Sequence, residues 1–298
     1  MTHSRTMLDL LDEVEQLARS TSPILVLGES GTGKELIASG IHRLSGRAGS
    51  FVPINCGALP REIIESELFG HVAGSFTGAT RDQAGLLEVC DQGTAFLDEI
   101  SEMSQELQSR LLRYLETGEV RRVGSSKTVR VDTRVVAATN RERAAIEKGE
   151  RFRTDLYYRL AHAVVTLPPL RHRGADVGLL VEHFLKESCR AEGKRVRLAA
   201  GARRRLEAHS WPGNVRQLRS VIRRAVILAR EGREVGPGEL ELGDGKAATT
   251  LLEELEQAEK RRVIEALQQR GGSRTEAARL LGIPRTTLLN KLRRYGLM

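Results

Sequence analysis

The chain has 298 residues, 40% of them hydrophobic, and a formal net charge of +8. This length suits two domains, or one large domain with small appendages, and the hydrophobic fraction is that of an ordinary soluble globular protein. The positive charge makes an acidic polymer such as nucleic acid a natural partner, although basic proteins without such a partner also exist.

The cysteines and the apolar runs argue against three classes of protein. Cys56, Cys90 and Cys189 are odd in number, far apart and without metal-ligand spacing, which excludes a disulfide framework and a zinc site and fits a reducing compartment. Acidic residues interrupt the leucines of the first 20 residues, and no later apolar run approaches the roughly 20 residues of a membrane span. We therefore expect a cytoplasmic protein with no membrane partner.

The first part of the chain alternates between helical and extended patterns. Apolar residues recur at helical spacing from Leu8 to Ala18, and further helical stretches follow, such as residues 105–116. Four short apolar runs between them predict strands, and these runs cover residues 24–27, 51–55, 94–97 and 134–139. This alternation predicts an α/β fold with a parallel sheet.

The rest of the chain is predicted to be mainly helical. Pro168-Pro169 ends the alternation, and between Asp176 and Arg230 the apolar residues have helical spacing, which predicts a small all-α lid. Residues 232–245 are rich in glycine and suit a linker. The predicted organisation is an α/β core over residues 1–165, a lid over 166–231, a linker over 232–250 and a three-helix domain over 251–298.

A phosphate-binding loop is predicted directly after the first strand, where the sequence reads GESGTGKE. Glycines let backbone N–H groups curl around phosphates, the following helix N-terminus adds positive potential, and Lys34 supplies a charge for the outer phosphates. The candidate nucleotide contacts are Gly28, Glu29, Ser30, Gly31, Thr32, Gly33, Lys34 and Glu35. The alternative is a glycine-rich turn with an incidental lysine.

An acidic pair, Asp98 and Glu99, follows the predicted strand at residues 94–97. Open α/β sheets bind ligands at the carboxyl ends of their strands. The general phosphate-loop pattern ends in Ser or Thr, where this chain has Glu35, so magnesium must depend on Asp98. We assign Asp98 to metal binding and Glu99 to orienting and activating the attacking water.

Three polar residues further along the core each have two interpretations. Asn140 ends the strand at residues 134–139, where its amide could sense the terminal phosphate or cap a helix. Arg153 and Arg159 would lie about a turn and a half apart on a helix, near enough for one anionic target. Such arginines are ordinarily surface ion pairs, and the residues alone do not decide between these interpretations.

Residues 251–298 predict a helix-turn-helix domain. A long helical pattern precedes two short helices separated by Gly282, and Pro284 lies where the third helix starts. That third helix would present its first turns to base edges and its remainder to phosphates. The candidates are Arg285, Thr286, Thr287 and Asn290 for bases, and Lys291, Arg293 and Arg294 for phosphates. The alternative is a solvated amphipathic helix.

Taken together, these motifs resemble those of bacterial enhancer-binding proteins, the AAA+ activators of sigma-54 RNA polymerase. The similar segments run from about Ile24 to Leu228 and resume at the C-terminus, which resembles a Fis-type DNA-binding domain. The resemblance implies an AAA+ P-loop core with a parallel sheet, an all-α lid and a C-terminal helix-turn-helix domain. In that family the phosphate loop commonly carries Glu at the position of Glu35.

The resemblance also assigns roles to residues that the patterns left open. Asn55 matches the asparagine that holds the catalytic glutamate, and Asn140 belongs to the match with the first sensor. Arg153 and Arg159 match arginine fingers that reach the γ-phosphate of a neighbouring subunit. The segment WPGNVRQL matches the lid motif, with Arg216 as the second sensor.

The segment GSFTGA, residues 74–79, predicts by itself only a flexible surface loop. It resembles the GAFTGA loop through which this family contacts sigma-54, with Phe76 as an apolar anchor and Thr77 as a hydroxyl contact. The implied contact residues are Gly74, Ser75, Phe76, Thr77, Gly78 and Ala79. Ser75 replaces the usual Ala, and this small-for-small change leaves its effect on coupling open. Residues 119–132 look like the family's neighbouring hairpin.

The resemblance implies ATP and Mg²⁺ as cofactors, and sigma-54 RNA polymerase holoenzyme and upstream double-stranded DNA as partners. Fingers supplied in trans are worth roughly 10³ to 10⁵ in rate, so a self-assembled ring, hexameric by resemblance, is implied. The C-terminal domain would dimerise through its first helix and place its recognition helices about 34 Å apart. Because the core begins almost at Met1, we expect either a separate regulatory protein or a truncated chain.

The favoured function is an ATPase that binds upstream DNA, oligomerises and remodels the sigma-54 closed complex into an open complex. One rival is a DNA-binding regulator that uses ATP only to assemble and works with another sigma factor; it predicts a degenerate loop or finger, whereas Phe76, Thr77, Arg153 and Arg159 are present. The other rival is an AAA+ motor for DNA processing or protein unfolding, which needs a translocation pore motif that we do not find.

Overall fold

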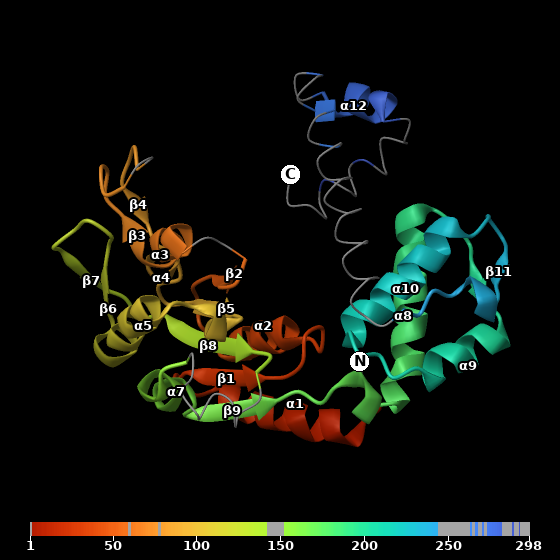
Figure 1. The fold of residues 1–298 in the computed structure, drawn as a ribbon, viewed down its shortest axis with the longest axis horizontal. Coiled ribbons are helices and arrows are strands. Elements are labelled where there is room, and N and C mark those ends of the chain that lie inside the picture. The colour runs from red at the N-terminus through yellow and green to blue at the C-terminus, as the bar shows by residue number, and fades with distance from the viewer. Residues whose placement is uncertain are drawn as a thin grey trace. The chain divides into compact units, whose positions relative to one another are not determined.

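The computed structural model describes residues 2–58, 61–76, 79–141 and 152–243, and positions 263, 266, 267, 270, 273–281, 288 and 292 nearer the C-terminus. The chain divides into two compact units (Figure 1). One unit is Arg5–Pro169, and the other is Leu170–Met298 together with Met1–Ser4.

The first unit is built on a five-stranded parallel sheet with the order β2-β5-β8-β1-β9. The strands are β1 (Ile24–Leu27), β2 (Phe51–Asn55), β5 (Thr94–Asp98), β8 (Arg134–Thr139) and β9 (Ala163–Thr166). The predicted parallel α/β sheet is therefore confirmed, and β9 is a fifth strand that the sequence analysis did not predict. All five strands end at the same edge of the sheet, which brings together the segments that follow them.

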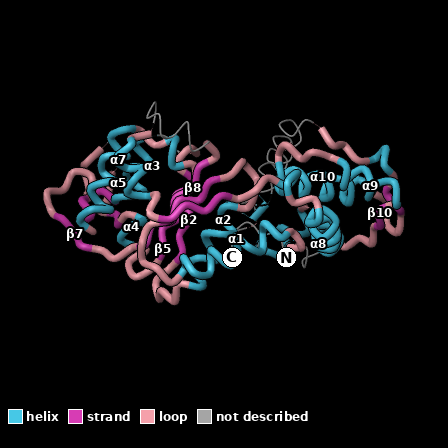
Figure 2. The backbone as a smooth tube through the Cα atoms, turned by 90° about the horizontal axis from the view of Figure 1, so that it is seen from below, coloured by secondary structure: helices cyan, strands magenta, loops and turns pink. Residues whose placement is uncertain are grey.

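Helices cover both faces of this sheet (Figure 2). They are α1 (Arg5–Ala18), α2 (Lys34–Leu44), α3 (Arg61–Phe69), α4 (Leu86–Val89), α5 (Gln105–Thr117) and α7 (Thr154–Leu160), with a 3₁₀ turn at Ile100–Glu102. Successive strand residues point to opposite faces, so Val26 packs with α1 and α2, whereas Leu25 and Leu27 pack with α3, α5 and α7. The continuous apolar strands follow from this burial on both faces.

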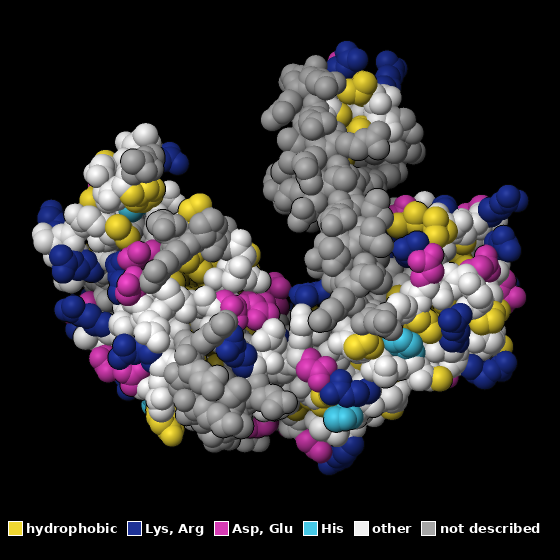
Figure 3. Space-filling model, in the orientation of Figure 1, with side chains coloured by type: hydrophobic (Ala, Val, Ile, Leu, Met, Phe, Trp, Pro, Cys, Tyr) yellow, Lys and Arg dark blue, Asp and Glu magenta, His cyan; other side chains and the backbone are white. Residues whose placement is uncertain are grey.

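Two small antiparallel pairs extend from the first unit. One joins β3 (Gly70–His71) to β4 (Gln83–Ala84), and the other joins β6 (Glu119–Arg121) to β7 (Thr128–Arg130), which confirms the expected hairpin. The β6–β7 hairpin carries exposed Arg121, Lys127 and Arg130, and Figure 3 shows Lys and Arg side chains over this arm. Backbone hydrogen bonds from Val72 to Val123 (3.1 Å) and from Val123 to Gly70 (2.9 Å) join the two pairs.

The second unit contains the predicted helical lid. Its elements are a 3₁₀ turn at Leu170–His172, α8 (Ala175–Glu192), β10 (Arg197–Leu198), α9 (Ala200–Ala208), α10 (Asn214–Leu228), β11 (Glu234–Val235) and a 3₁₀ turn at Pro237–Glu239. The structure differs from the sequence analysis at the predicted linker, because β11 pairs with β10 and both Val235 and Leu240 are buried in the lid core. The burial of Val235 and Leu240 therefore fixes this segment to the lid, although its glycine-rich composition is typical of a linker.

A small separate cluster marks the C-terminal region. Helix α12 (Arg274–Leu280) buries Ala277 and Ala278 against Val263, Ala266, Leu288 and Leu292. Together these residues form a small hydrophobic core. Among the described helices of the whole chain, none is long and apolar enough to cross a membrane.

Candidate functional site

The predicted phosphate loop connects β1 to α2, as its sequence requires. The Gly28 N–H donates to the Thr139 carbonyl at 3.3 Å, so the loop starts directly beside the end of β8. Gly31 and Gly33 have φ angles of 77° and 106°, which L side chains rarely adopt. Thr32 is buried beneath them. The glycines therefore permit the tight curl that exposes backbone N–H groups to a phosphate.

Lys34, the first residue of α2, lies across this loop. Its Nζ donates to the carbonyls of Gly28 at 2.9 Å and Glu29 at 3.3 Å, and the residue is only 6% exposed. Ser30 and Glu35 are exposed at the loop and in the first turn of α2. A lysine held at the mouth of a loop of this geometry, beside a helix N-terminus, fits a nucleoside triphosphate.

The acidic pair lies at the end of β5, in the middle of the same sheet edge. Asp98 Oδ1 accepts a hydrogen bond from the Glu99 N–H at 3.0 Å, and both side chains are half-buried. Glu99 has φ 54° and ψ 43°, a left-handed conformation that is uncommon for a residue other than glycine. Such a backbone costs on the order of 1–3 kcal/mol and is concentrated at functional sites. The strain makes Glu99 the strongest catalytic candidate at this edge.

Two asparagines flank the acidic pair from the neighbouring strands. Asn140, which follows β8, donates from Nδ2 to Glu99 Oε1 at 3.4 Å. Asn55 ends β2 in register with Asp98, and its Oδ1 accepts the Gly57 N–H at 2.9 Å. The structure thus places both predicted asparagines beside the acidic pair and gives the contact with Glu99 to Asn140. The alternative role of Asn140 as a helix cap concerns residues outside those described.

Cys56 follows Asn55 directly, so its thiol lies close to the acidic pair and responds to the charge of the two carboxylates. Its N–H donates to the Asp98 carbonyl at 2.9 Å. Burial raises the pKa of the Cys56 thiol, and the negative charges of Asp98 and Glu99 raise it further. The carboxylates therefore act on the end of β2 as well as on their own strand.

The two predicted finger arginines lie at the two ends of α7. Arg153 is the N-cap residue, and its guanidinium forms an ion pair with Asp155 at 2.7 Å that raises the pKa of Arg153. Arg159 donates from Nε and Nη2 to the Leu115 carbonyl at 3.2 and 2.8 Å. Both side chains are thus held by acceptors of their own subunit. The surface ion pair that the sequence analysis gave as the alternative is present for Arg153.

The GSFTGA loop connects β3 to β4. The Gly74 N–H donates to the Ala79 carbonyl at 2.8 Å, and the Ala79 N–H donates to the Phe76 carbonyl at 3.1 Å, so the base of the loop is closed. Phe76 is 41% exposed. Thr77 and Gly78 lie outside the described residues, as do the predicted DNA contacts Arg285, Thr286, Thr287, Asn290, Lys291, Arg293 and Arg294.

Models of known protein families match three consecutive parts of the chain. The sigma-54 interaction domain matches residues 1–166, the AAA+ ATPase lid domain matches 171–258, and the Fis family of bacterial regulatory proteins matches 254–295. The chain belongs to the sigma-54 interaction family. It combines a sigma-54 interaction domain and an AAA+ ATPase lid domain with a Fis-type DNA-binding domain, as expected of a sigma-54-dependent transcriptional activator.

Similar proteins from other bacteria support this assignment. The regulatory protein AtoC of Escherichia coli (strain K12) is 44% identical over 100% of this chain and 68% of its own length. The Nif-specific regulatory protein of Azotobacter vinelandii is 45% identical over 94% of this chain. This sigma-54 interaction protein spans only 56% of the length of that second relative.

Solved structures of NtrX from Brucella abortus have the same fold. The complex with ADP has a TM-score of 0.75 at 32% identity, and the complex with ATP has a TM-score of 0.73 at 34% identity. Both comparisons cover 99% of this chain and 69% of NtrX. A nucleotide is thus present in two structures of one protein, NtrX, that has the fold of this sigma-54 interaction protein.

The lid motif of this sigma-54 interaction protein contains residues whose roles the sequence did not reveal. Asn214, fully buried at the start of α10, accepts the Leu170 N–H at 2.8 Å. Trp211, also fully buried, donates from Nε1 to the Leu206 carbonyl at 2.9 Å. Both residues have a φ angle of 52°, which is unusual for residues other than glycine. It is this backbone geometry, and not a pattern in the sequence, that singles out Trp211 and Asn214. Arg216, the predicted second sensor, is exposed on α10 in the second unit.

Proposed function

We propose that this chain uses ATP hydrolysis at the carboxyl edge of its sheet to move the GSFTGA loop against sigma-54, so that a closed promoter complex becomes an open complex. The supporting observation is the arrangement of that edge. The phosphate loop begins beside the end of β8, while Glu99 is strained and in contact with Asn140. An ATPase site of this kind and a sigma-54 interaction domain occur in one unit.

We assign a separate role in hydrolysis to each group of residues at this edge. The loop from Gly28 to Glu35, with Lys34 at its mouth, would bind the phosphates, and Arg216 would complete the site from the lid. Glu99 would orient the attacking water and accept its proton, while Asn140 and Asn55 would position Glu99.

Magnesium, if bound, would need few protein ligands. No group of three or more His, Cys, Asp or Glu that could hold a metal occurs among the described residues. Mg²⁺ is commonly bound by one or two carboxylates together with substrate phosphates. Asp98 fits this arrangement, since Glu35 stands where a hydroxyl ligand is usual.

Assembly would complete the site. Arg153 and Arg159 would leave Asp155 and the Leu115 carbonyl and reach the γ-phosphate bound by a neighbouring subunit in a ring, which we expect to be a hexamer. An arginine supplied in trans stabilises charge that develops in the transition state. Turnover would then rise with protein concentration.

The C-terminal domain would bind upstream DNA and so keep the ATPase of the same chain there. Dimers formed through the first helix of that domain would present Arg285, Thr286, Thr287 and Asn290 to bases and Lys291, Arg293 and Arg294 to phosphates. Such binding places the ATPase near its promoter in the cytoplasm.

The substitution Thr77→Ala tests the assignment of the loop. We expect ATP turnover within about twofold of the parent chain and loss of open-complex formation by purified sigma-54 holoenzyme, because Thr77 does not belong to the hydrolytic edge. Ser126→Ala is the matched control, since Ser126 is exposed on the neighbouring hairpin. Normal open-complex formation by the Thr77 variant would contradict the proposal.

A further inference from the structure

The phenylalanine of the GSFTGA loop rests on a supported histidine. The rings of Phe76 and His71 are 5.0 Å apart between centroids and meet edge to face at 67°. His71 is 7% exposed, and its Nδ1 shares a hydrogen bond of 2.7 Å with the hydroxyl of Ser66, which is 5% exposed on α3. This chain of contacts fixes the imidazole and gives Phe76 one defined resting place, while the rest of its ring remains exposed.

The neighbouring residue, Ser75, is poorly accommodated in the same loop conformation. It packs against Gly124 of the β6–β7 hairpin so closely that a β-carbon added to Gly124 would lie 2.6 Å from the Ser75 β-carbon. The Ser75 hydroxyl oxygen is buried, and none of the described residues offers it a hydrogen bond. A buried hydroxyl without a partner is unfavourable, because its hydrogen bonds to water are lost and not replaced.

Backbone hydrogen bonds hold this conformation together. Besides the pairing of Gly74 with Ala79, the Ser75 N–H donates to the Val72 carbonyl at 3.2 Å and the Ala73 N–H donates to Asp82 Oδ1 at 2.8 Å. The loop base is therefore a closed, hydrogen-bonded state. It carries one favourable aromatic contact at Phe76 and one unfavourable buried hydroxyl at Ser75.

We propose that Ser66 and His71 are positioning residues that hold Phe76 in a resting seat, and that Ser75 weakens this seat so that the loop is released more readily than with alanine at position 75. The function of this device rests on the proposed contact between Phe76 and sigma-54. Release would hydrate the Ser75 hydroxyl and separate Phe76 from His71. Ser66 and Ser75 thus act on the same equilibrium in opposite directions.

Amide hydrogen exchange of the full chain over residues 70–84 tests the seat directly. Ser66→Ala removes the support of His71, and we expect faster exchange at the amides that close the loop, by about 3-fold to 10-fold from the loss of one hydrogen bond. Ser75→Ala removes the buried hydroxyl, and we expect slower exchange of the same amides by a similar factor. Ser126→Ala, on the exposed part of the hairpin, should change neither.

ATP turnover and open-complex formation supply the functional readout. Ser66→Ala should hydrolyse ATP at the parental rate, while Ser75→Ala should open promoters more slowly because less of the loop is released. Unchanged or equally directed exchange in the two variants would overturn the seat. The exchange measurement needs no sigma-54, so its failure is distinct from the failure of the proposed function, which the Thr77 variant tests.

Discussion

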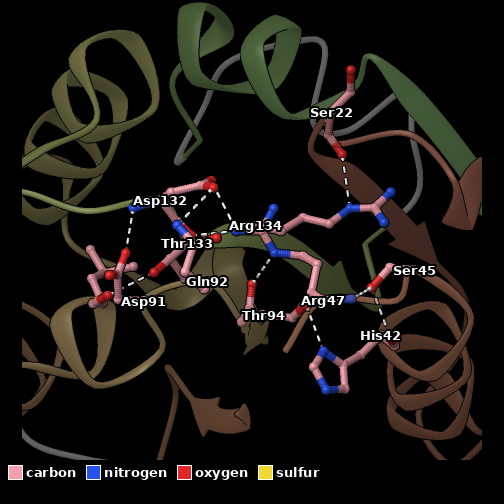
Figure 4. Close-up of polar contacts among 12 residues, drawn as sticks. Ser22, His42, Ser45, Arg47, Asp91, Gln92, Thr94, Asp132, Thr133 and Arg134 are labelled. Carbon is pink, nitrogen blue, oxygen red and sulfur yellow. Dashed lines mark hydrogen bonds and ion pairs between the residues drawn. The ribbon is translucent and has the colours of Figure 1, made fainter. Parts of the chain in front are cut away.

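The two edges of the central sheet are built in opposite ways. At the amino edge, Arg134 is 2% exposed and donates to the carbonyls of Leu17, Ala18 and Ser22 at 2.8, 2.7 and 3.3 Å. Figure 4 shows the contact with Ser22. These carbonyls come from the end of α1 and the turn after it, where backbone acceptors lack helical partners. The carboxyl edge instead carries the strained Glu99, whose Oε1 accepts a hydrogen bond from Asn140 Nδ2 at 3.4 Å.

The neighbours of Arg134 continue the contrast. Arg47 donates from Nε to the Gly93 carbonyl at 2.8 Å and pairs with Asp132 at 2.9 Å, and His42 shares a hydrogen bond of 2.9 Å with Thr94. Burial and, to a smaller extent, the charge of Arg47 together lower the pKa of Arg134 to about 10. One edge therefore uses buried charge to join segments, while the other places the half-buried carboxylates of Asp98 and Glu99 where a ligand can reach them.

The largest effect should come from Arg159, the arginine that we propose to act on the carboxyl edge of a neighbouring subunit. Arg159→Ala should reduce ATP turnover by about 10³-fold or more, the range for a lost arginine finger. Mixing this variant with Glu99→Gln should restore part of the turnover, because one interface of the mixed ring then has both groups. Arg113→Ala, an exposed arginine on α5, is the matched control. Absence of complementation would contradict action in trans.

Glu99→Gln tests the edge itself. Loss of the group that accepts the proton should reduce turnover by about 10² to 10⁴-fold, with ATP binding retained because Lys34 and the loop are unchanged. Turnover assays and calorimetric titration with ATP measure the two quantities. Glu102→Gln serves as the control, since Glu102 pairs with Arg141 nearby. Equal losses of binding and turnover would show that Glu99 maintains the loop and is not specific to hydrolysis.

Local patterns were sufficient to predict most of this sheet and its site. Four strands, the phosphate loop and the acidic pair are each encoded in a short run of residues. The strand β9 was missed because Ala163–Thr166 was not separated from the segment that leads to Pro168-Pro169. The strand order explains another limit. Because β5 lies between β2 and β8, Asn55 and Asn140 both flank Glu99. The resemblance gave the contact with Glu99 to Asn55, whereas in the structure Asn140 makes the hydrogen bond.

Contacts between distant segments were beyond sequence reasoning. Arg134 reads in the sequence as the polar start of a strand, and its acceptors lie more than 110 residues earlier. The seat of Phe76 likewise depends on the position of His71 against α3 and of Ser75 against Gly124. The linker was misassigned because composition does not reveal that Val235 and Leu240 enter the lid core.

Arg134→Met breaks the amino edge alone. Three carbonyls would lose the guanidinium donor, and among the described residues only that of Leu17 keeps a second donor, the Ser20 N–H. We therefore expect the free energy of unfolding to fall by about 2–4 kcal/mol, with ATP affinity unchanged for the folded protein. Urea unfolding and ATP titration measure the two quantities. Arg130→Met, on the exposed strand β7, should leave stability nearly unchanged. A loss of ATP affinity without a loss of stability would contradict the division between the edges.

The smallest effect concerns thiols near both edges. Burial raises the pKa of Cys90 to about 11, so this thiol and that of Cys56 remain protonated at pH 8. Cys189 is half-exposed in the lid. Alkylation at pH 8, followed by mass spectrometry, should modify Cys189 first, because the thiolate is the reactive form. Early modification of Cys56 would show that the carboxyl edge opens in solution.

Open-complex formation by purified sigma-54 holoenzyme on a strong sigma-54 promoter tests the central claim most directly. The protein is added at a concentration high enough to bypass upstream DNA, with either ATP or a non-hydrolysable analogue. We predict opening with ATP and none with the analogue, because hydrolysis at Glu99 must move the loop. Equal opening with both nucleotides, or no opening despite measurable ATP turnover, would contradict the account.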